Sequence, residues 1–146
     1  MAEPTRIELP HSRFCRSLSP NDLAQIQRAC RICHFPAGTE VFQEGDPGDG
    51  LYVILQGSVD IVSQLISGKT YILSHMEAGD YFGEMAIFDG EPRSATARVC
   101  QSLEAAFVPV GAVRELVDRC PTAGAMLVRE ASLRLREFQS QCGRLC

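Results

Sequence analysis

One short segment of the chain contains an acid and a base of the types that bind sugar phosphates. Glu84 and Arg93 lie nine residues apart, with Gly83 directly before the acid and Pro92 directly before the base. A carboxylate accepts hydrogen bonds from ribose hydroxyls, and a guanidinium pairs with a phosphate through charge-assisted hydrogen bonds. Gly83 has no Cβ, so a ligand can approach the backbone there, and free N–H groups at a helix start can meet a phosphate. The pattern favours a site for a small anionic sugar phosphate, and its alternative is a structural ion pair.

The composition is that of one globular domain with no marked affinity for polyanions or lipid. The 146 residues are 45% hydrophobic and 22% charged, with a formal net charge of −4. A negative net charge argues against broad nucleic-acid binding, which needs a basic face. No apolar run approaches the length that crosses a bilayer, and the N-terminal stretch lacks the apolar core of a signal peptide. The seven scattered cysteines are therefore interpreted as reduced thiols, and we expect a cytoplasmic protein.

The first periodic segment predicts a helix near the N-terminus. Ser19 is a suitable N-cap and Pro20 suits the first helical position, and apolar residues then recur at helical spacing from Leu23 onward. Pro36 is expected to end this segment. We therefore predict a helical N-terminal region over about residues 14–35.

The middle of the chain changes to short apolar segments separated by glycine turns. Six candidate strands cover residues 39–43, 51–56, 58–63, 70–76, 95–100 and 104–108. Many short strands with regular glycine punctuation indicate a sandwich or barrel rather than a parallel α/β sheet. We expect a β-roll over about residues 36–110.

Helical periodicity returns after the predicted roll, over about residues 111–142. The last segment carries one apolar stripe made of Leu127, Ala131, Leu135, Phe138 and Cys142. Such a stripe can cover the core of its own domain or meet the same stripe of a second copy, and both can hold because a lid helix has two sides. No repeat or linker divides the chain, so we expect a single domain over residues 1–146.

Two sequence blocks resemble the cyclic nucleotide-binding domain family, which includes the catabolite activator protein, kinase regulatory subunits and cyclic nucleotide-gated channels. One block is the glycine-rich stretch over residues 44–59, and the other is residues 82–99, which resemble the phosphate-binding cassette of that family. Their order and separation match the family, which makes the resemblance specific. It implies a mainly β fold, an eight-stranded jelly roll with flanking helices, in which Gly45 and Gly57 are structural turn glycines.

The resemblance also implies which residues bind the ligand. Glu84 would contact the ribose 2′-hydroxyl, and Arg93 would contact the cyclic phosphate. Ser94 and the backbone N–H of Ala95 would also face the phosphate, while Gly83 and the neighbouring amides would line the ribose-phosphate pocket. The implied ligand-binding residues are Gly83, Glu84, Met85, Arg93, Ser94 and Ala95.

The function that follows from the resemblance is a non-enzymatic sensor of cyclic AMP or cyclic GMP, with no other cofactor, catalytic residue or metal. Ligand would tighten the cassette, and the final helix, about residues 122–142, would close over the base as a lid. The expected partners are the cyclic nucleotide and either a second copy, joined as a homodimer through the C-terminal helix, or an effector outside this chain. Family members that act on DNA continue into a helix-turn-helix, whereas this chain ends within a few residues of its last helix. We therefore expect no direct nucleic-acid binding by this chain and no membrane span.

Two other functions compete with this interpretation. The first is an interaction module that keeps the fold but has lost the ligand; degenerate members usually lack the acid or the base, and both are present here. The second is a redox or metal protein that uses Cys30, Cys33 and His34, although a metal there needs a fourth ligand that the neighbouring sequence does not supply. An enzyme is not favoured, because no nucleophile–base pair stands out. His75 belongs to no recognisable group of ligands in the sequence.

Overall fold

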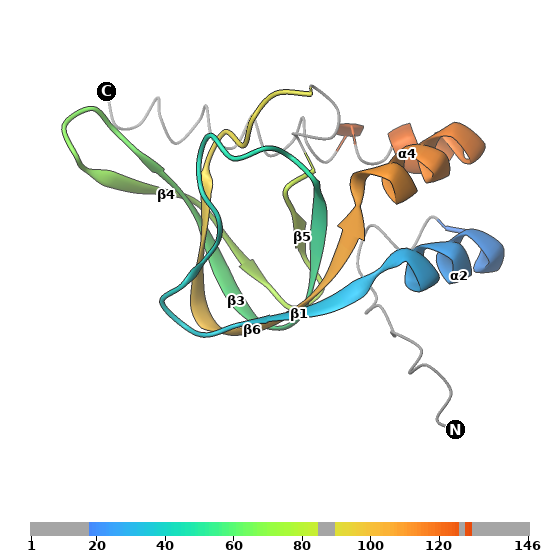
Figure 1. Ribbon diagram of the computed structural model, residues 1–146, viewed down its shortest axis with the longest axis horizontal. Coiled ribbons are helices and arrows are strands. Elements are labelled where there is room, and N and C mark those ends of the chain that lie inside the picture. Colours follow the sequence, from blue (N-terminus) through green and yellow to red (C-terminus); the bar gives the residue numbers. More distant parts are fainter. Residues whose placement is uncertain (1–17, 85–89, 126–127, 130–146) are drawn as a thin grey trace.

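The computed structural model describes residues 18–84, 90–125 and 128–129 (Figure 1). Within these residues the chain order is α2 (Pro20–Ala29), β1 (Arg31–Phe35), β2 (Glu40–Phe42), β3 (Gly50–Gln64), β4 (Thr70–Glu77), β5 (Tyr81–Phe82), β6 (Thr96–Pro109) and α4 (Val110–Arg119). Residues 121–125 and 128–129 are also helical. The mainly β fold with flanking helices that the sequence predicts is confirmed.

Helix α2 begins where the sequence predicts. The side chain of Ser19 accepts a hydrogen bond from the backbone N–H of Asp22 at 3.2 Å, and Pro20 is the first helical residue. The hydroxyl of Ser19 in turn donates to the carboxylate of Asp22 at 2.9 Å. This cap satisfies one of the N–H groups that a helix start leaves without an internal partner.

The same helix is shorter than the sequence predicts. It ends at Ala29, and strand β1 begins two residues later, so the predicted helical region over about residues 14–35 is wrong beyond Ala29. Strand β1 pairs antiparallel with β6, which takes up the backbone hydrogen bonds that a longer helix would form within itself. The predicted roll therefore begins earlier than residue 36. Residues 14–17 of the helical prediction lie outside the described residues.

The six strands form one antiparallel sheet that curls into a roll (Figure 1). Its order is β1-β6-β3-β4, with β2 also paired to β6 and β5 also paired to β3. The long strands β3 and β6 pair with each other, and register shifts interrupt that pairing. One end of β3 pairs with β5 and the other with β4, while one end of β6 pairs with β1 and the other with β2. Strands β3 and β6 each contribute two segments, one at each end, and the other four strands contribute one segment each. The six strands thus provide the eight segments of the expected jelly roll.

Gly57 bends a strand rather than separating two strands. Predicted neighbours merge into single long strands: residues 51–56 with 58–63 in β3, and 95–100 with 104–108 in β6. Gly57 has a φ of +96°, and a Cβ there would lie 2.2 Å from the carbonyl oxygen of Ser102. Both the backbone conformation and the close crossing therefore require glycine at this bend.

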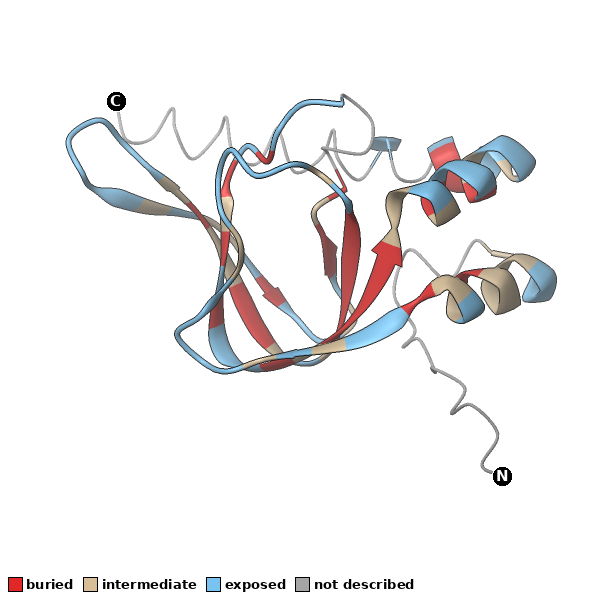
Figure 2. Ribbon diagram, in the orientation of Figure 1, coloured by how far each residue is buried: buried red, intermediate tan, exposed pale blue. Residues whose placement is uncertain are grey.

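Buried side chains form two clusters on opposite faces of the central strands. Figure 2 shows that burial concentrates on the ribbons of β3, β5 and β6. Leu51 and Val53 of β3 belong to one cluster, and the alternating residues Tyr52 and Ile54 belong to the other. Strand β6 alternates in the same way over residues 105–108. Both faces of these strands are therefore covered, which explains why the sequence shows continuous apolar runs there.

Helices α2 and α4 lie side by side and cover one end of the roll (Figure 1). Ile26 of α2 and Leu116 of α4 belong to the same buried cluster as Leu51 of β3. Helix α4 is the first part of the helical region predicted over about residues 111–142, and the apolar stripe predicted for its last part lies outside the described residues. Within the described ranges, no helix combines the length and the apolar character that crossing a bilayer requires.

Candidate functional site

Backbone hydrogen bonds bring the two sequence blocks together around Arg93. The N–H of Arg93 donates to the carbonyl oxygen of Asp46 at 2.8 Å, and the N–H of Gly45 donates to the carbonyl oxygen of Arg93 at 2.8 Å. The hydroxyl of Thr96 accepts a hydrogen bond from the N–H of Glu44 at 2.9 Å. Gly45 has a φ of +93°, as expected for a structural turn glycine. The chain between β2 and β3 thus fixes the position from which the Arg93 side chain projects.

The side chain of Arg93 is buried and held by oxygen acceptors from three residues. Only 4% of the residue is exposed. Nη1 donates to the carbonyl oxygen of Gly83 at 2.6 Å, and Nη2 donates to the carbonyl oxygen of Gly50 at 2.8 Å and to Oδ1 of Asp49 at 3.0 Å. A guanidinium has five N–H groups, so these contacts leave two of them for another acceptor. One of the two is the buried Nε–H, which has no hydrogen-bond partner in the described part of the chain.

A layer of aromatic rings lies beside the guanidinium. Cζ of Arg93 is 4.1 Å from the ring centroid of Phe42, whose ring is 5.9 Å from that of Phe82. Tyr52 and Phe82 are cross-strand partners in β3 and β5, and their rings stack with centroids 5.3 Å apart. A cation is attracted to the face of an aromatic ring, and an apolar surrounding strengthens every charge interaction that the cation makes.

Gly83 and Glu84 follow strand β5 at the edge of the same site. Gly83 has a φ of +88°, and a Cβ there would lie 2.6 Å from Nη1 of Arg93. The close approach that the sequence predicts at Gly83 is therefore made, in this structure, by the guanidinium. Glu84 is only 3% exposed, so a buried carboxylate lies next in sequence to the carbonyl that holds Arg93.

Among the described residues, Ser94 and Ala95 make no contact that defines a role in ligand binding. Ser94 is exposed, and Ala95 is buried directly before β6. Met85 lies outside the described residues. Their roles beside a phosphate or a ribose stay predictions.

Sequence reasoning missed three residues that hold Arg93, namely Phe42, Asp49 and Gly50. The sequence predicts only a break between strands at Asp49 and Gly50. The backbone carbonyl of Gly50 could not be predicted as an acceptor, because every residue type carries such a carbonyl. Gly50 does carry a spatial signal: a Cβ there would lie 2.3 Å from the carbonyl oxygen of Val108, so the position requires glycine. Asp49 is one of three acidic residues in the first block, with Glu44 and Asp46, and residue type alone does not single it out as the partner of the cassette arginine.

This arrangement can bind a small anion. Asp49 is a carboxylate partner of Arg93, and its side chain is 64% exposed and therefore screened by water. The buried guanidinium keeps N–H groups from which an anion with several oxygen atoms can accept hydrogen bonds. Because Arg93 is almost inaccessible, the anion must displace one of the present contacts or move the segment that follows Gly83.

The structure does not bring Cys30, Cys33 and His34 together as a ligand set. Cys30 belongs to the buried cluster under the helices, whereas Cys33 packs against the other cluster inside the roll. His34 is exposed and forms a pair with Glu104, with Nε2 and Oε2 3.3 Å apart. Cys33 and His34 are neighbours on β1, and successive strand side chains point to opposite faces. The metal function proposed for these three residues is therefore not supported.

The environment of Tyr52 predicts a loss of stability at alkaline pH. Burial, and to a smaller extent the charge of Asp49, raise the pKa of Tyr52 from 10.0 to about 12, while Arg93 opposes the shift. The folded state therefore favours the protonated phenol, and this contribution is fully present below pH 10 and is lost as the pH rises through about 12. We expect the free energy of unfolding to fall by roughly 1–3 kcal/mol over that interval. Urea unfolding at several pH values measures it.

Tyr52→Phe is the variant that checks this assignment. It keeps the stacked ring but removes the ionisable group, so the decline between pH 10 and 12 should become shallower. Tyr71→Phe, at a half-buried position in β4, is the matched control and should keep the decline of the wild type. Equal slopes for wild type and Tyr52→Phe would contradict the assignment.

The sequence and the fold are similar to those of known cyclic nucleotide-binding proteins. Residues 32–120 match the family described as the cyclic nucleotide-binding domain. The CRP-like cAMP-activated global transcriptional regulator of Mycobacterium tuberculosis is 33% identical over 128 residues, which are 88% of this chain and 57% of that protein. The cAMP-dependent protein kinase regulatory subunit of Aspergillus niger is 39% identical over 82 residues, which are 55% of this chain and 19% of that protein.

A solved structure supports the same comparison. The Catabolite Activator Protein of Thermus thermophilus superposes with a TM-score of 0.80 at 26% identity, covering 92% of this chain and 63% of that one. The chain thus spans less than two thirds of the length of each of these relatives. The family match over residues 32–120 includes the segment that contains Glu84 and Arg93.

Proposed function

The chain belongs to the cyclic nucleotide-binding domain family, and from this we propose that it is a regulatory domain that binds cyclic AMP or cyclic GMP between Glu84 and Arg93. The observation that carries the proposal is the buried guanidinium of Arg93, whose Nε–H has no partner among the described residues, close to the buried Glu84. A ribose cyclic phosphate needs one cation and one hydroxyl acceptor, and both groups are present in a place with little water. The matched relatives are regulatory proteins rather than catalysts, and we assign no catalytic residue.

Arg93 and Glu84 would bind different parts of the ligand. The cyclic phosphate accepts hydrogen bonds from Nε and from the remaining hydrogen on Nη1 of Arg93, and the Ser94 hydroxyl and the Ala95 N–H add to these. The ribose 2′-hydroxyl donates to the carboxylate of Glu84, while the backbone at Gly83 and Met85 lines the sugar. The ligand gives up bonds to water when it forms these bonds, so the net gain comes mainly from the charge-assisted pairs in the apolar surrounding.

A chain of contacts connects the proposed ligand site with helix α4. The backbone carbonyl of Asp49 accepts a hydrogen bond from the N–H of Val110, the first residue of α4, at 2.9 Å, while the Asp49 side chain pairs with Arg93. Gly50, whose carbonyl also holds Arg93, is the cross-strand partner of Pro109. A phosphate that shifts the Arg93 side chain alters its hydrogen bonds to Asp49 and Gly50 and therefore changes the support of the helix start.

We place the output of the domain in its C-terminal helices. Ligand shifts the population toward a form in which the cassette is tightened and the final helix, about residues 122–142, closes over the base. Most of that helix lies outside the described residues, and its movement is argued from the α4 contacts. A second copy, as a homodimer through this helix, or an effector domain or protein would then sense the change. We place this sensor in the cytoplasm, where it would meet cyclic nucleotides. The net charge of −4 argues against direct nucleic-acid binding by this chain.

Calorimetric titration with cyclic AMP, cyclic GMP and 5′-AMP tests the proposed function. We expect one cyclic nucleotide to bind per chain and to raise the melting temperature, because the ligand binds only the folded state. 5′-AMP should bind at least tenfold more weakly, since its phosphate carries a second charge that one buried guanidinium does not compensate. If neither cyclic nucleotide at millimolar concentration produced heat or a shift in melting temperature, the proposal would be wrong. The chain would then be an interaction module with the same fold.

Hydrogen exchange with saturating cyclic nucleotide examines the coupling step in the same samples. Exchange should slow in α4 and in residues 121–142 as well as in the cassette, because the closed form orders both. Protection confined to residues 83–96 would mean that ligand binds without moving the helices.

A further inference from the structure

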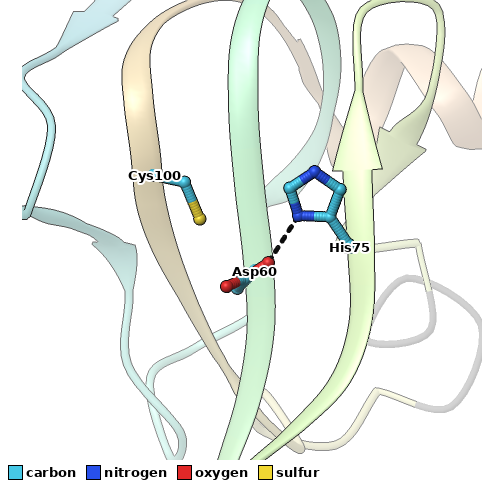
Figure 3. Close-up of side chains that lie close together, drawn as sticks. All are labelled: Asp60, His75 and Cys100. Atoms are coloured by element: carbon cyan, nitrogen blue, oxygen red, sulfur yellow. Dashed lines mark hydrogen bonds and ion pairs between the residues drawn. The ribbon is translucent and has the colours of Figure 1, made fainter.

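Three side chains with metal-binding atoms meet on the outer face of the roll, on a different part of the sheet from Arg93. Asp60 lies on β3, His75 on β4 and Cys100 on β6, so three adjacent strands each contribute one residue (Figure 3). One ligand atom from each residue lies within 4.8 Å of the others. Within the described ranges, these three form the only such group of histidine, cysteine and acidic side chains.

Strand register explains how the group forms. Asp60 and His75 are direct cross-strand partners, and Asp60 is also the partner of Arg98 on the opposite side. The pairing of β3 with β6 then shifts, so that Cys100 is an extra residue in β6 with no partner of its own in β3. A bulge of this kind bends a strand and re-aims a side chain. Figure 3 shows the thiol of Cys100 on the same face as Asp60 and His75.

The histidine ring is held at both nitrogens by carboxylates. Nδ1 of His75 is 2.6 Å from Oδ1 of Asp60, and Nε2 is 3.4 Å from Oε1 of Glu77. Histidines that bind metals usually donate the N–H of their other nitrogen to a carboxylate, which fixes the ring and its tautomer. Glu77 is placed to hold Nε2 while Nδ1 faces Asp60 and Cys100.

We propose that Asp60, His75 and Cys100 form a binding site for a zinc ion, with Glu77 as the carboxylate that orients the histidine. Thiolate sulfur, imidazole nitrogen and carboxylate oxygen are the three ligand types that Zn²⁺ takes in proteins, and three protein ligands leave a fourth tetrahedral position for water. The site is independent of the proposed nucleotide site.

The present distances need only side-chain adjustment to accept the ion. Tetrahedral ligand atoms of zinc lie about 3.5 Å from one another, so Nδ1 of His75 and Oδ1 of Asp60 have to separate by about 1 Å. The sulfur of Cys100 has to move toward both of them. The side chains of His75 and Asp60 are 49% and 21% exposed, and Cys100 is exposed, so an ion can reach all three from solvent. Nδ1 of His75 and Oδ1 of Asp60 share a hydrogen bond at 2.6 Å, so without metal a proton lies between these two atoms, in the place that the ion takes.

The alternative is an ordinary surface pair of histidine and aspartate with a thiol nearby by chance. The chain provides an internal comparison, because His34 and Glu104 form another exposed cross-strand pair of histidine and carboxylate, on β1 and β6. No third ligand joins that pair among the described residues. The two pairs therefore allow a matched test within one protein.

Zinc affinity is measured on the full chain under reducing conditions, by competition with a chromophoric chelator. Cys100→Ser, His75→Gln and Asp60→Asn should each weaken the tightest zinc site by at least tenfold or abolish it. His34→Gln and Cys33→Ser, the matched controls, should stay within twofold of wild type. All five positions are at least partly exposed, and a thermal melt without metal verifies that each variant is folded.

Cobalt substitution provides a second, spectroscopic readout. Co²⁺ added to the wild type should produce a thiolate-to-cobalt charge-transfer absorption that saturates at one equivalent and disappears in Cys100→Ser. The proposal is overturned if the wild type binds no zinc up to millimolar free concentration. It is equally overturned if zinc binding and the cobalt spectrum persist unchanged in folded Cys100→Ser and His75→Gln, because the cation then sits at other thiols.

Discussion

Replacing Arg93 with alanine is expected to weaken cyclic nucleotide binding by about 2–5 kcal/mol, a loss of about 30- to 5,000-fold in affinity. The guanidinium is 4% exposed and lies over the ring of Phe42, so a phosphate beside it is shielded from water. Removing the cation leaves a desolvated anion without its partner, which costs more than the loss of a surface pair. Isothermal calorimetry with cyclic AMP and cyclic GMP measures the change.

Two further variants separate the role in binding from the role in folding. Arg93→Lys keeps the positive charge but cannot donate to Gly83, Gly50 and a phosphate from one planar group, so it should bind more weakly than wild type and more tightly than the alanine variant. Arg98→Ala removes an exposed arginine of β6, five residues further along the chain, and should leave nucleotide affinity within twofold. Thermal melts report whether each variant is folded. A folded Arg93→Ala protein that binds within twofold of wild type would show that the phosphate role is wrong.

The second large effect concerns the sugar. We expect the wild type to bind 2′-deoxy cyclic AMP more weakly than cyclic AMP by about 1–3 kcal/mol, or about 5- to 150-fold. Glu84 is 3% exposed, and a ligand without the hydroxyl leaves a buried carboxylate with one acceptor unsatisfied. Calorimetric titration of the same preparation with both ligands gives the ratio.

Substitution of the acid assigns that discrimination to one side chain. Glu84→Ala should bind both ligands weakly and with similar affinity, because the group that senses the hydroxyl is gone. Glu91→Gln changes the charge of the same segment at an exposed position and should keep the preference of the wild type. Equal affinities of the wild type for cyclic AMP and its 2′-deoxy analogue would show that Glu84 does not bind the ribose 2′-hydroxyl.

The sequence by itself determined the features that depend on neighbouring residues. Ser19 and Pro20 predict the start of α2 because a cap and a first-turn proline act within one turn of helix. Glycines predict turns because a positive φ is a property of one residue, as Gly45 and Gly83 illustrate. Glu84 and Arg93 were predicted as a pair for the same reason, since their residue types and spacing lie within one short segment.

Only the tertiary structure decided the features that depend on strand pairing. Residues 31–35 form a strand because β6, about 70 residues later, supplies their hydrogen bonds; a local pattern does not contain that partner. Asp49 and Gly50 hold Arg93 across 44 and 43 residues of sequence, and one of the acceptors is a carbonyl that every residue type carries.

The two groups of cysteine and histidine illustrate the same division. Cys30, Cys33 and His34 are close in sequence, but their side chains lie in different surroundings. Cys30 follows the end of α2, and Cys33 and His34 alternate between the two faces of β1. Asp60, His75 and Cys100 are spread over three strands, and a one-residue shift in the pairing of β3 with β6 brings them together. Register is set by pairing between distant segments, and a slip of one residue moves every side chain to the opposite face, so the sequence alone does not determine such a group.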